Sequence, residues 1–279
     1  MRHTDEYRYD VMRDNQEQIV MLHVQNELAP QPNQHFHNSM EFVYVAEGRI
    51  CARLGSNSVK VEKGELLALP SFLPHDFPRK DAELWQLIVP RSLMGNLDKL
   101  MEHKTLDRLV IADSDGQLLT YMRLIYDIYT RRGAFAALDA GAAQNAANTA
   151  ASNFVRVVIA LCGLREATGS STLVMQAIRY LSEHFREPVR VGEISQKLYC
   201  NRSQLSALFR ETFGLSMNEY ITRLRAAEVR RLLTEETNIT LAEACSAAGF
   251  GSLRTLHRAY KEIYGCAPCA SVDHPSEQT

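Results

Sequence analysis

The sequence repeats one pattern of ten residues in its C-terminal third. LSALFRETFG covers residues 205–214, and LHRAYKEIYG covers residues 256–265. Each copy places Leu, an aromatic residue, a basic residue, Glu, a second aromatic residue and Gly at the same relative positions. Apolar residues at this spacing share one face of an α-helix, and Gly is typical of the residue that ends a helix. The repeat therefore predicts two copies of one helical unit.

The residues before the second copy predict a short helix and a tight turn. Thr240 and Glu243 have the spacing of a capping box, in which a hydroxyl and a carboxylate satisfy backbone NH groups at the start of a helix. Gly249 suits a left-handed turn position, and Phe250 can fill the corner that follows. A second helix is predicted over 252–264. Two short helices joined by a turn that contains Gly are typical of a helix-turn-helix motif.

The second helix of this motif has a basic outer face. Its apolar stripe consists of Leu256, Ala259, Tyr260 and Ile263. Its opposite face carries the basic side chains of Arg254, His257, Arg258 and Lys261. Arginine can hold a guanine or a phosphate with two hydrogen bonds, and histidine or lysine can add phosphate contacts. This face is therefore predicted to bind DNA.

The first copy has the same organisation with a smaller and less charged outer face. Asn201 and Gln204 resemble a capping box, and the core stripe is predicted to consist of Leu205, Leu208 and Phe209. The outer face is predicted to consist of Arg202, Ser203, Ser206, Ala207 and Arg210.

One uninterrupted helix is predicted between the two copies. Residues 216–235 contain neither Gly nor Pro and keep a helical apolar period. A helix of this length spans about 30 Å, and successive major grooves on one side of DNA lie about 34–36 Å apart. The linking helix can therefore set two recognition helices into adjacent grooves.

Two such motifs bridged by one helix resemble the AraC/XylS family of bacterial transcription regulators. The resemblance covers residues 172–270 and rests on the Ala-Gly-Phe turn at 248–250, the two aromatic-Gly endings and Pro268. It implies base contacts from Ser203, Ser206, Ala207, Arg254, Thr255 and Arg258. The chain carries a formal net charge of −2, but Lys and Arg outnumber Asp and Glu within this region.

The segment from 19 to 90 has the pattern of a small β domain. Apolar runs at 41–46, 50–54 and 66–69 alternate with turn sequences, which is typical of a β-sandwich or barrel. His35, His37 and Glu41, followed by Gly64, Pro70 and His75, resemble the two halves of the cupin motif. Strand alternation places His35 and His37 on one face, with Glu41 an even number of residues away.

Three explanations stay open for His35, His37, Glu41 and His75. They can line an effector pocket, they can make structural hydrogen bonds, or they can hold Fe, Mn, Ni or Zn. Aromatic walls of the pocket are predicted at Tyr44, Phe72, Phe77 and Trp85, with ordinary core packing as the alternative.

Helical periodicity follows the barrel. In TYMRLIYDIY, residues 120–129, the apolar residues Tyr121, Leu124, Ile125 and Ile128 share one face. The segment 133–151 is compatible with a helix or a loose connector, whereas 153–164 predicts an apolar helix and 163–171 a linker. We expect these helices to pair with a second subunit, and packing on their own barrel is the alternative.

The predicted fold class is α+β with several domains. A cupin-like effector-sensing β-barrel is expected at 1–90, a helical dimerisation or connector segment at 91–168, and an all-α double helix-turn-helix domain at 169–279. The polar N-terminus, the short apolar runs and six scattered Cys predict a cytoplasmic protein with reduced thiols that does not associate with membranes.

The functional hypothesis is a ligand-responsive transcription regulator. By family analogy, we expect an activator that senses a small metabolite such as a sugar, binds promoter DNA as a homodimer and contacts RNA polymerase. We expect neither enzyme activity nor a cofactor. The alternatives are a metal-dependent cupin enzyme, such as a dioxygenase or isomerase, fused to a DNA-binding domain, and a constitutive DNA-binding protein with a degenerate barrel.

Overall fold

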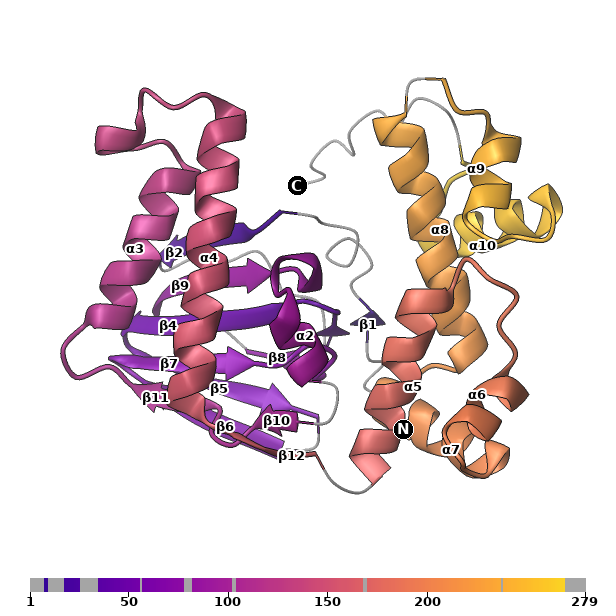
Figure 1. The fold of residues 1–279 in the computed structure, drawn as a ribbon, viewed down its shortest axis with the longest axis horizontal. Coiled ribbons are helices and arrows are strands. Elements are labelled where there is room, and N and C mark those ends of the chain that lie inside the picture. Colours follow the sequence, from indigo (N-terminus) through magenta and orange to yellow (C-terminus); the bar gives the residue numbers. More distant parts are fainter. Residues whose placement is uncertain are drawn as a thin grey trace. The chain divides into compact units, whose positions relative to one another are not determined.

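The computed structural model describes residues 8–9, 18–25, 35–55, 57–77, 82–101, 104–167, 170–236 and 238–268. The chain divides into two compact units, 1–169 and 170–279 (Figure 1). The division lies inside the segment 163–171 that the sequence predicts as a linker. The first unit combines strands and helices, and the described part of the second contains helices only, so the predicted fold class is confirmed.

Two five-stranded sheets form the first unit. One sheet has the order β1 (Arg8–Tyr9), β3 (His35–Phe36), β8 (His75–Asp76), β5 (Arg49–Leu54) and β6 (Asn57–Glu62). The other has the order β11 (Val110–Ala112), β7 (Glu65–Leu69), β4 (Met40–Glu47), β9 (Glu83–Val89) and β2 (Val20–Gln25). Neighbouring strands are antiparallel except β1 and β3. The predicted strands at 41–46, 50–54 and 66–69 correspond to β4, β5 and β7.

The second sheet is buried on both faces. Side chains such as Val43 and Leu84 pack between the two sheets, with Ile50 and Val61 from the opposite sheet. Their neighbours, such as Phe42, pack instead against helices of the same unit. This double burial explains why the sequence of β4 is almost uniformly apolar, whereas β5, with one exposed face, alternates between buried and exposed residues.

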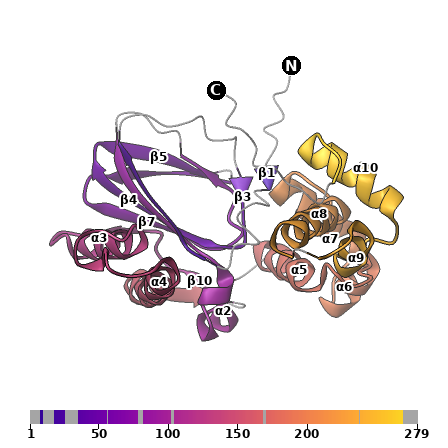
Figure 2. The same ribbon diagram turned by 90° about the horizontal axis from the view of Figure 1, so that it is seen from above.

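Helices α3 (Gln117–Tyr129) and α4 (Ala140–Cys162) cover this sheet. Figure 2 shows them against the side of the sheet that faces away from β5. The rings of Phe42 and Phe154 meet edge to face at 5.5 Å, and small residues of α4 (Ala143, Ala147, Ala151) are completely or almost completely buried. Helices α3 and α4 therefore pack on their own barrel, which is one of the two arrangements expected for them from the sequence.

The alanine-rich stretch is helical for most of its length. A short 3-10 helix, η2 (Gly133–Phe135), precedes Asp139, whose side chain accepts a hydrogen bond from the NH of Ala142 and starts α4. One helix then runs through 140–162, so the two predicted segments at 133–151 and 153–164 join. Alanine has the highest intrinsic helix propensity, which supports this continuity.

The region 91–168 also contains short elements that helical periodicity does not predict. They are η1 (Arg91–Leu93), α2 (Asn96–Leu100) and the paired strands β10 (Lys104–Leu106) and β12 (Leu164–Glu166), in addition to β11. Two-residue and three-residue strands carry too little sequence for an alternation to be visible.

The second unit contains α5 (Ser170–His184), α6 (Val191–Lys197), α7 (Arg202–Phe213), α8 (Met217–Glu235), α9 (Leu241–Ala247) and α10 (Leu253–Tyr264). Figure 1 shows α8 along the middle of this unit, with α6 and α7 at one end and α9 and α10 at the other. Capping boxes start α8 at Ser216 and α9 at Thr240, as predicted for the latter.

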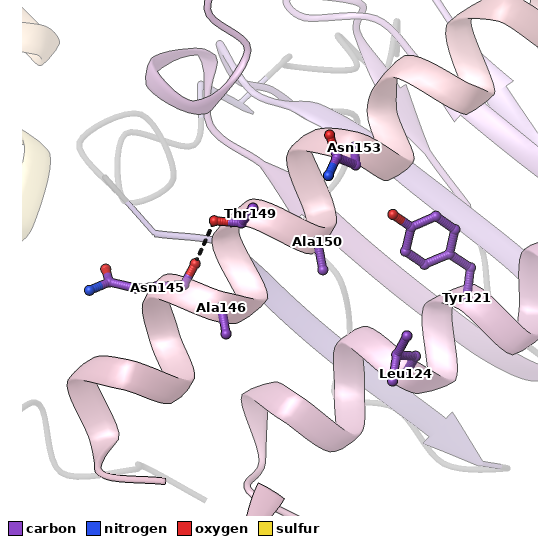
Figure 3. Close-up of a pocket in the computed structure, with 7 residues that line it drawn as sticks. All are labelled: Tyr121, Leu124, Asn145, Ala146, Thr149, Ala150 and Asn153. Carbon is purple, nitrogen blue, oxygen red and sulfur yellow. Dashed lines mark hydrogen bonds between the residues drawn. The ribbon is translucent and has the colours of Figure 1, made fainter.

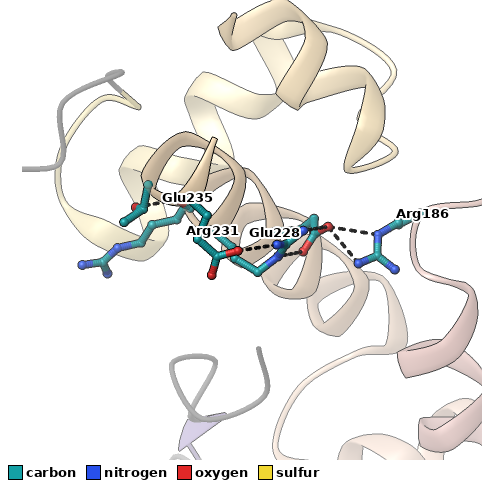
Figure 4. Close-up of polar contacts among 6 residues, drawn as sticks. Arg186, Glu228, Arg231 and Glu235 are labelled. Atoms are coloured by element: carbon teal, nitrogen blue, oxygen red, sulfur yellow. Dashed lines mark hydrogen bonds and ion pairs between the residues drawn. The ribbon is translucent and has the colours of Figure 1, made fainter. Parts of the chain in front are cut away.

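An ion cluster ties the connection after α5 to α8 (Figure 4). The carboxylate of Glu228, which is 3% exposed, accepts hydrogen bonds from Arg186 at 2.8 Å and from Arg231 at 3.0 Å. Burial by itself raises the pKa of Glu228, but the hydrogen bonds from Arg231 and Arg186 lower it below its ordinary value. The carboxylate thus stays ionised and fixes the position of Arg186.

Within the described residues, none of the helices is long and apolar enough to span a bilayer.

Candidate nucleic-acid interface and histidine cluster

Helix α10 presents a basic surface because its opposite side packs on α8 and α9. The side chain of Ser252 accepts a hydrogen bond from the NH of Thr255 and starts the helix. Leu256, Ala259 and Tyr260 are buried with residues of α8 and α9. The predicted outer residues are all exposed: Arg254, Thr255, His257, Arg258 and Lys261. The structure therefore brings together the complete predicted surface of the second helix-turn-helix motif.

The turn between α9 and α10 depends on Gly249. Its φ angle is +83°, and a Cβ atom there would lie 2.4 Å from the carbonyl oxygen of Arg186. The NH of Phe250 donates to the carbonyl of Cys245 at 3.0 Å, and the Phe250 ring is buried at the corner. The predicted turn geometry is thus present, and the contact with Arg186 is an additional constraint that local sequence does not reveal.

Helix α7 presents the surface of the first helix-turn-helix motif. The side chain of Asn201 accepts hydrogen bonds from the NH groups of Ser203 and Gln204, while Leu205 and Phe209 are fully buried. All predicted outer residues are exposed: Arg202, Ser203, Ser206, Ala207 and Arg210. Two cations and three short side chains make this surface smaller and less charged than that of α10.

The turn between α6 and α7 contains a residue that the sequence does not single out. Tyr199 has a φ angle of +52°, and its side chain is 96% exposed. An exposed aromatic residue at a left-handed position has no signature in apolar periodicity, since periodicity reports burial. Only the second turn, with its Gly, has the composition expected for this conformation.

Helix α8 connects the two surfaces. It packs on α7 at one end and on α9 and α10 at the other. Its 19 residues span about 28 Å at 1.5 Å per residue. Successive major grooves on one side of DNA lie about 34–36 Å apart. The recognition helices lie beyond the ends of α8, so the distance between them exceeds the length of α8 and approaches this spacing.

The four residues of the cupin-like motif converge in the first unit. His35 pairs with His75 across β3 and β8, and Glu41 lies on β4. Potential ligand atoms of His35, His37, Glu41 and His75 all lie within 4.8 Å of one another, and all four residues are buried. One carboxylate oxygen of Glu41 lies 3.0 Å from Nε2 of His37 and 3.2 Å from Nε2 of His75.

A fifth polar residue, Gln86, completes this cluster. Its side-chain amide donates a hydrogen bond to the second carboxylate oxygen of Glu41, and its side chain is 1% exposed. The cupin-like motif does not include Gln86. A signal is nevertheless present, because Gln86 is the polar residue in the middle of the apolar run ELWQLIV, and a buried polar side chain needs partners.

The ring nitrogens of the cluster have defined roles. Nδ1 of His37 lies 3.1 Å from the carbonyl oxygen of Ser39, and Nδ1 of His75 lies 2.8 Å from that of Leu73. Since a carbonyl only accepts, each Nδ1 carries a proton. In both residues the Nε2 atom faces Glu41. It donates to the carboxylate when the ring is doubly protonated and offers a lone pair to a cation when the ring is neutral.

The charge of Glu41 makes this arrangement selective for cations. Burial by itself raises the pKa of Glu41, but hydrogen bonds to His37 and His75 hold it well below its ordinary value. An ionised carboxylate facing two lone pairs requires either a second proton on the rings or a cation between the groups. Three imidazoles and one carboxylate fit Fe, Mn or Zn, and carbonyl acceptors on Nδ1 orient such ligands.

Two of the predicted effector-contacting residues do not join the cluster. Tyr44 and Trp85 lie on the helix-facing side of the sheet, whereas Glu41 and Gln86 face the other sheet. The ring of Trp85 stacks on His23 at 3.9 Å. The prediction that Tyr44 and Trp85 line one pocket with the histidines is therefore corrected, because side chains alternate along a strand. Of the other two aromatic residues, Phe77 stacks on His75 at 5.9 Å and Phe72 is buried.

A surface groove runs between α3 and α4 (Figure 3). Its volume is about 670 Å³, and it is lined by Tyr121, Leu124, Asn145, Ala146, Thr149, Ala150 and Asn153. Next to it on α4, Val157 and Leu161 are 42% and 45% exposed. An apolar groove beside large exposed apolar side chains is typical of a surface that another helix covers.

Comparison with protein families matches both units. A helix-turn-helix domain model matches residues 194–270, and a cupin domain model matches residues 24–87. The matched ranges contain α7 to α10 and the histidine cluster, respectively. These matches agree with the two motifs that the sequence predicts.

Individual proteins with similar sequences or structures include bacterial regulators. The Msm operon regulatory protein of Streptococcus mutans is 31% identical over 105 residues, 37% of this chain and 37% of that protein. The melibiose operon regulatory protein of Escherichia coli K12 is 23% identical over 95 residues, 34% of this chain and 31% of that protein. The aligned segments span about a third of the length of these relatives. The crystal structure of a lysine-to-alanine variant of apo ToxT from Vibrio cholerae is 12% identical, with a TM-score of 0.48, and the match covers 92% of this chain and 97% of that chain.

Proposed function

We propose that the chain, which belongs to the AraC/XylS family of transcription regulators, is a bacterial regulator that binds promoter DNA through both helix-turn-helix units and responds to a small molecule. One observation carries this proposal. Both predicted recognition helices expose every residue that the sequence assigns to DNA contact, and α8 bridges them. Arg and Lys side chains on such helices bind phosphates and guanine edges.

The test is fluorescence anisotropy of the full chain on DNA from upstream of its own gene, at two salt concentrations. Specific binding that weakens as salt rises is expected, because cationic side chains displace counterions from DNA. Selection from random duplexes follows if that DNA does not bind. Failure of both assays contradicts the proposal.

The barrel unit is the proposed sensor. The effector is a small metabolite such as a sugar, in line with a relative that is named for a melibiose operon, and His35, His37, Glu41 and His75 contribute the polar contacts. The ligand shifts the population of DNA-binding arrangements by binding one of them more tightly. As an activator, the bound protein then positions RNA polymerase. DNA affinity that stays constant across a panel of sugars and related metabolites contradicts this part.

The proposed homodimer forms through α4. Val157 and Leu161 lie toward the C-terminal end of the exposed stripe, whereas Ala146 and Ala150 lie toward its N-terminal end. An antiparallel pairing of two α4 helices about a two-fold axis near Asn153 sets the large residues of each copy against the small residues of the other. A two-fold interface must be self-complementary in this way.

Substitution of Val157 by Glu is expected to convert the dimer into a monomer, because each copy of the interface then contains a charge without a partner. Sedimentation velocity of the wild type and of Val157→Glu measures the change. Lys99→Glu, on the exposed side of α2, introduces the same side chain elsewhere and should leave the dimer intact. A Val157→Glu protein that remains dimeric places the interface on another surface.

A second candidate function is a metal-dependent cupin enzyme, such as a dioxygenase or isomerase, joined to DNA-binding helices. It is favoured by the convergence of three buried imidazoles and one buried carboxylate, whose potential ligand atoms lie within 4.8 Å of one another. His35, His37, Glu41 and His75 would hold the ion, which would supply Lewis-acid or redox chemistry. Gln86 would orient Glu41 through its hydrogen bond.

For this candidate, about one equivalent of Mn, Fe or Zn per chain is expected to remain after incubation with the metal and exhaustive desalting, since a site of three His and one carboxylate suits these ions. Elemental analysis of the wild type and of His37→Ala measures the content, and the substitution should remove most of it. His23→Ala removes a histidine outside the cluster and serves as the control. A wild type that retains no metal excludes this candidate.

A further inference from the structure

Tyr199 occupies a strained position in the turn before α7. The turns of the two helix-turn-helix units have the same hydrogen bonds. Tyr199 NH donates to Gln196 and Cys200 NH to Ser195, just as Gly249 NH donates to Ser246 and Phe250 NH to Cys245. Tyr199 and Gly249 therefore hold equivalent left-handed positions, with φ angles of +52° and +83°.

The fold of the first helix-turn-helix motif does not benefit from an aromatic residue at this position. The left-handed conformation is unfavourable for a residue with a Cβ atom, and Gly adopts it freely. A buried ring could compensate through packing, but the Tyr199 side chain is 96% exposed. Strain without compensating packing concentrates at functional sites. Contact of the Tyr199 side chain with another molecule is thus the physical explanation for this residue.

The surroundings of Tyr199 suit a polyanion. It lies two residues before Asn201, the N-cap of α7, and the N-terminal part of a recognition helix is the part that contacts DNA. Lys197 and Arg202 flank it, and residues 194–210 contain no Asp or Glu. The outer face of α7 itself offers short side chains, so a longer side chain at its N-terminal end can reach contacts that Ser203 and Ala207 cannot.

We propose that Tyr199 is a DNA-contacting residue of the first helix-turn-helix motif, whose ring packs on a deoxyribose and whose hydroxyl donates a hydrogen bond to a phosphate oxygen. Tyrosine hydroxyls are among the groups that make such backbone contacts. This inference rests on the proposed DNA-binding function and adds to it a residue of the first helix-turn-helix motif. A phosphate contact contributes affinity on every DNA sequence, so Tyr199 supports the weakly charged α7 without reading bases.

The test is Tyr199→Gly in the full chain, measured by thermal unfolding and by DNA anisotropy over a range of salt concentrations. The midpoint of unfolding should stay unchanged or rise, because the substitution relieves strain. DNA affinity should fall by about five- to tenfold on specific and random duplexes alike, as expected for the loss of a hydrogen bond and a packed ring. Tyr199→Phe should lose part of this affinity.

Arg210→Ala, in the same helix-turn-helix motif, distinguishes the uncharged phosphate contact proposed for Tyr199 from the contact of a cationic side chain. Loss of an arginine–phosphate contact lowers the slope of log affinity against log salt by about one, whereas Tyr199→Gly should leave the slope unchanged. Wild-type affinity retained by Tyr199→Gly overturns the inference and leaves the proposed function standing. A wild type that binds no duplex overturns both. If Tyr199→Gly binds DNA like the wild type but binds another protein less tightly, the inference is likewise overturned, in favour of a protein contact.

Discussion

Replacing both Arg254 and Arg258 with Ala is expected to weaken specific DNA binding by about 30-fold or more. Both side chains are exposed on the outer face of α10, and an arginine that binds a guanine or phosphate bidentately contributes about 1–3 kcal/mol. The salt dependence of binding should also decrease, because fewer counterions are displaced. Fluorescence anisotropy at two salt concentrations measures both effects.

The fold should survive this double substitution, since neither side chain contributes to the buried cluster of α8, α9 and α10. Thermal unfolding checks this expectation. Arg49→Ala combined with Arg165→Ala removes the same charge from exposed positions of the barrel unit and should leave DNA affinity close to wild type. Equal losses in the two double variants would mean that net charge, and not the surface of α10, determines binding.

Gly249→Ala is expected to destabilise the second unit by on the order of 3 kcal/mol. A left-handed non-Gly residue costs about 1–3 kcal/mol, and a side chain forced into packed atoms adds a similar amount. Here the new Cβ would lie 2.4 Å from the carbonyl oxygen of Arg186, and Arg186 is fixed by Glu228. Urea unfolding of the full chain, followed by helical circular dichroism, measures the loss, and DNA affinity should fall with it.

Gly251→Ala is the matched control, because it lies two residues away in the same turn and its Cβ would enter open space. It should unfold at nearly the same urea concentration as the wild type. A Gly249→Ala protein that is as stable as Gly251→Ala would contradict the assigned contact with Arg186. The two variants differ mainly in backbone conformation and in this one close approach.

The helices of the DNA-binding unit could be predicted from sequence with small errors. Short-range interactions define them: the capping box of Thr240 and Glu243, the apolar period of α8 and the Gly that follows each recognition helix. The convergence of His35, His37, Glu41 and His75 was also predictable, because a known motif brings these positions together. In each case the relevant information lies within a few residues or in a recognised spacing.

The barrel shows where sequence reasoning fails. Tyr44 and Trp85 were candidates for the pocket because of their residue type, although their odd separation from Glu41 and from Gln86 places them on the opposite face of the sheet. Whether that face is exposed or covered depends on α3 and α4, which lie far along the chain. Their packing buries both aromatic residues, and the strand sequence alone contains no record of that.

Local sequence patterns specify the repeated helical unit, the bridging helix and the outer residues of both recognition helices, because periodicity and capping act over one or two helical turns. Contacts between distant segments determine that α4 packs on the barrel, that Gly249 adjoins the backbone of Arg186, and that Tyr199 is exposed to solvent at the equivalent turn. The two turns have the same backbone conformation and different neighbours. A left-handed position tolerates Tyr where space is open and requires Gly where another segment approaches, and such an approach depends on residues distant in the chain.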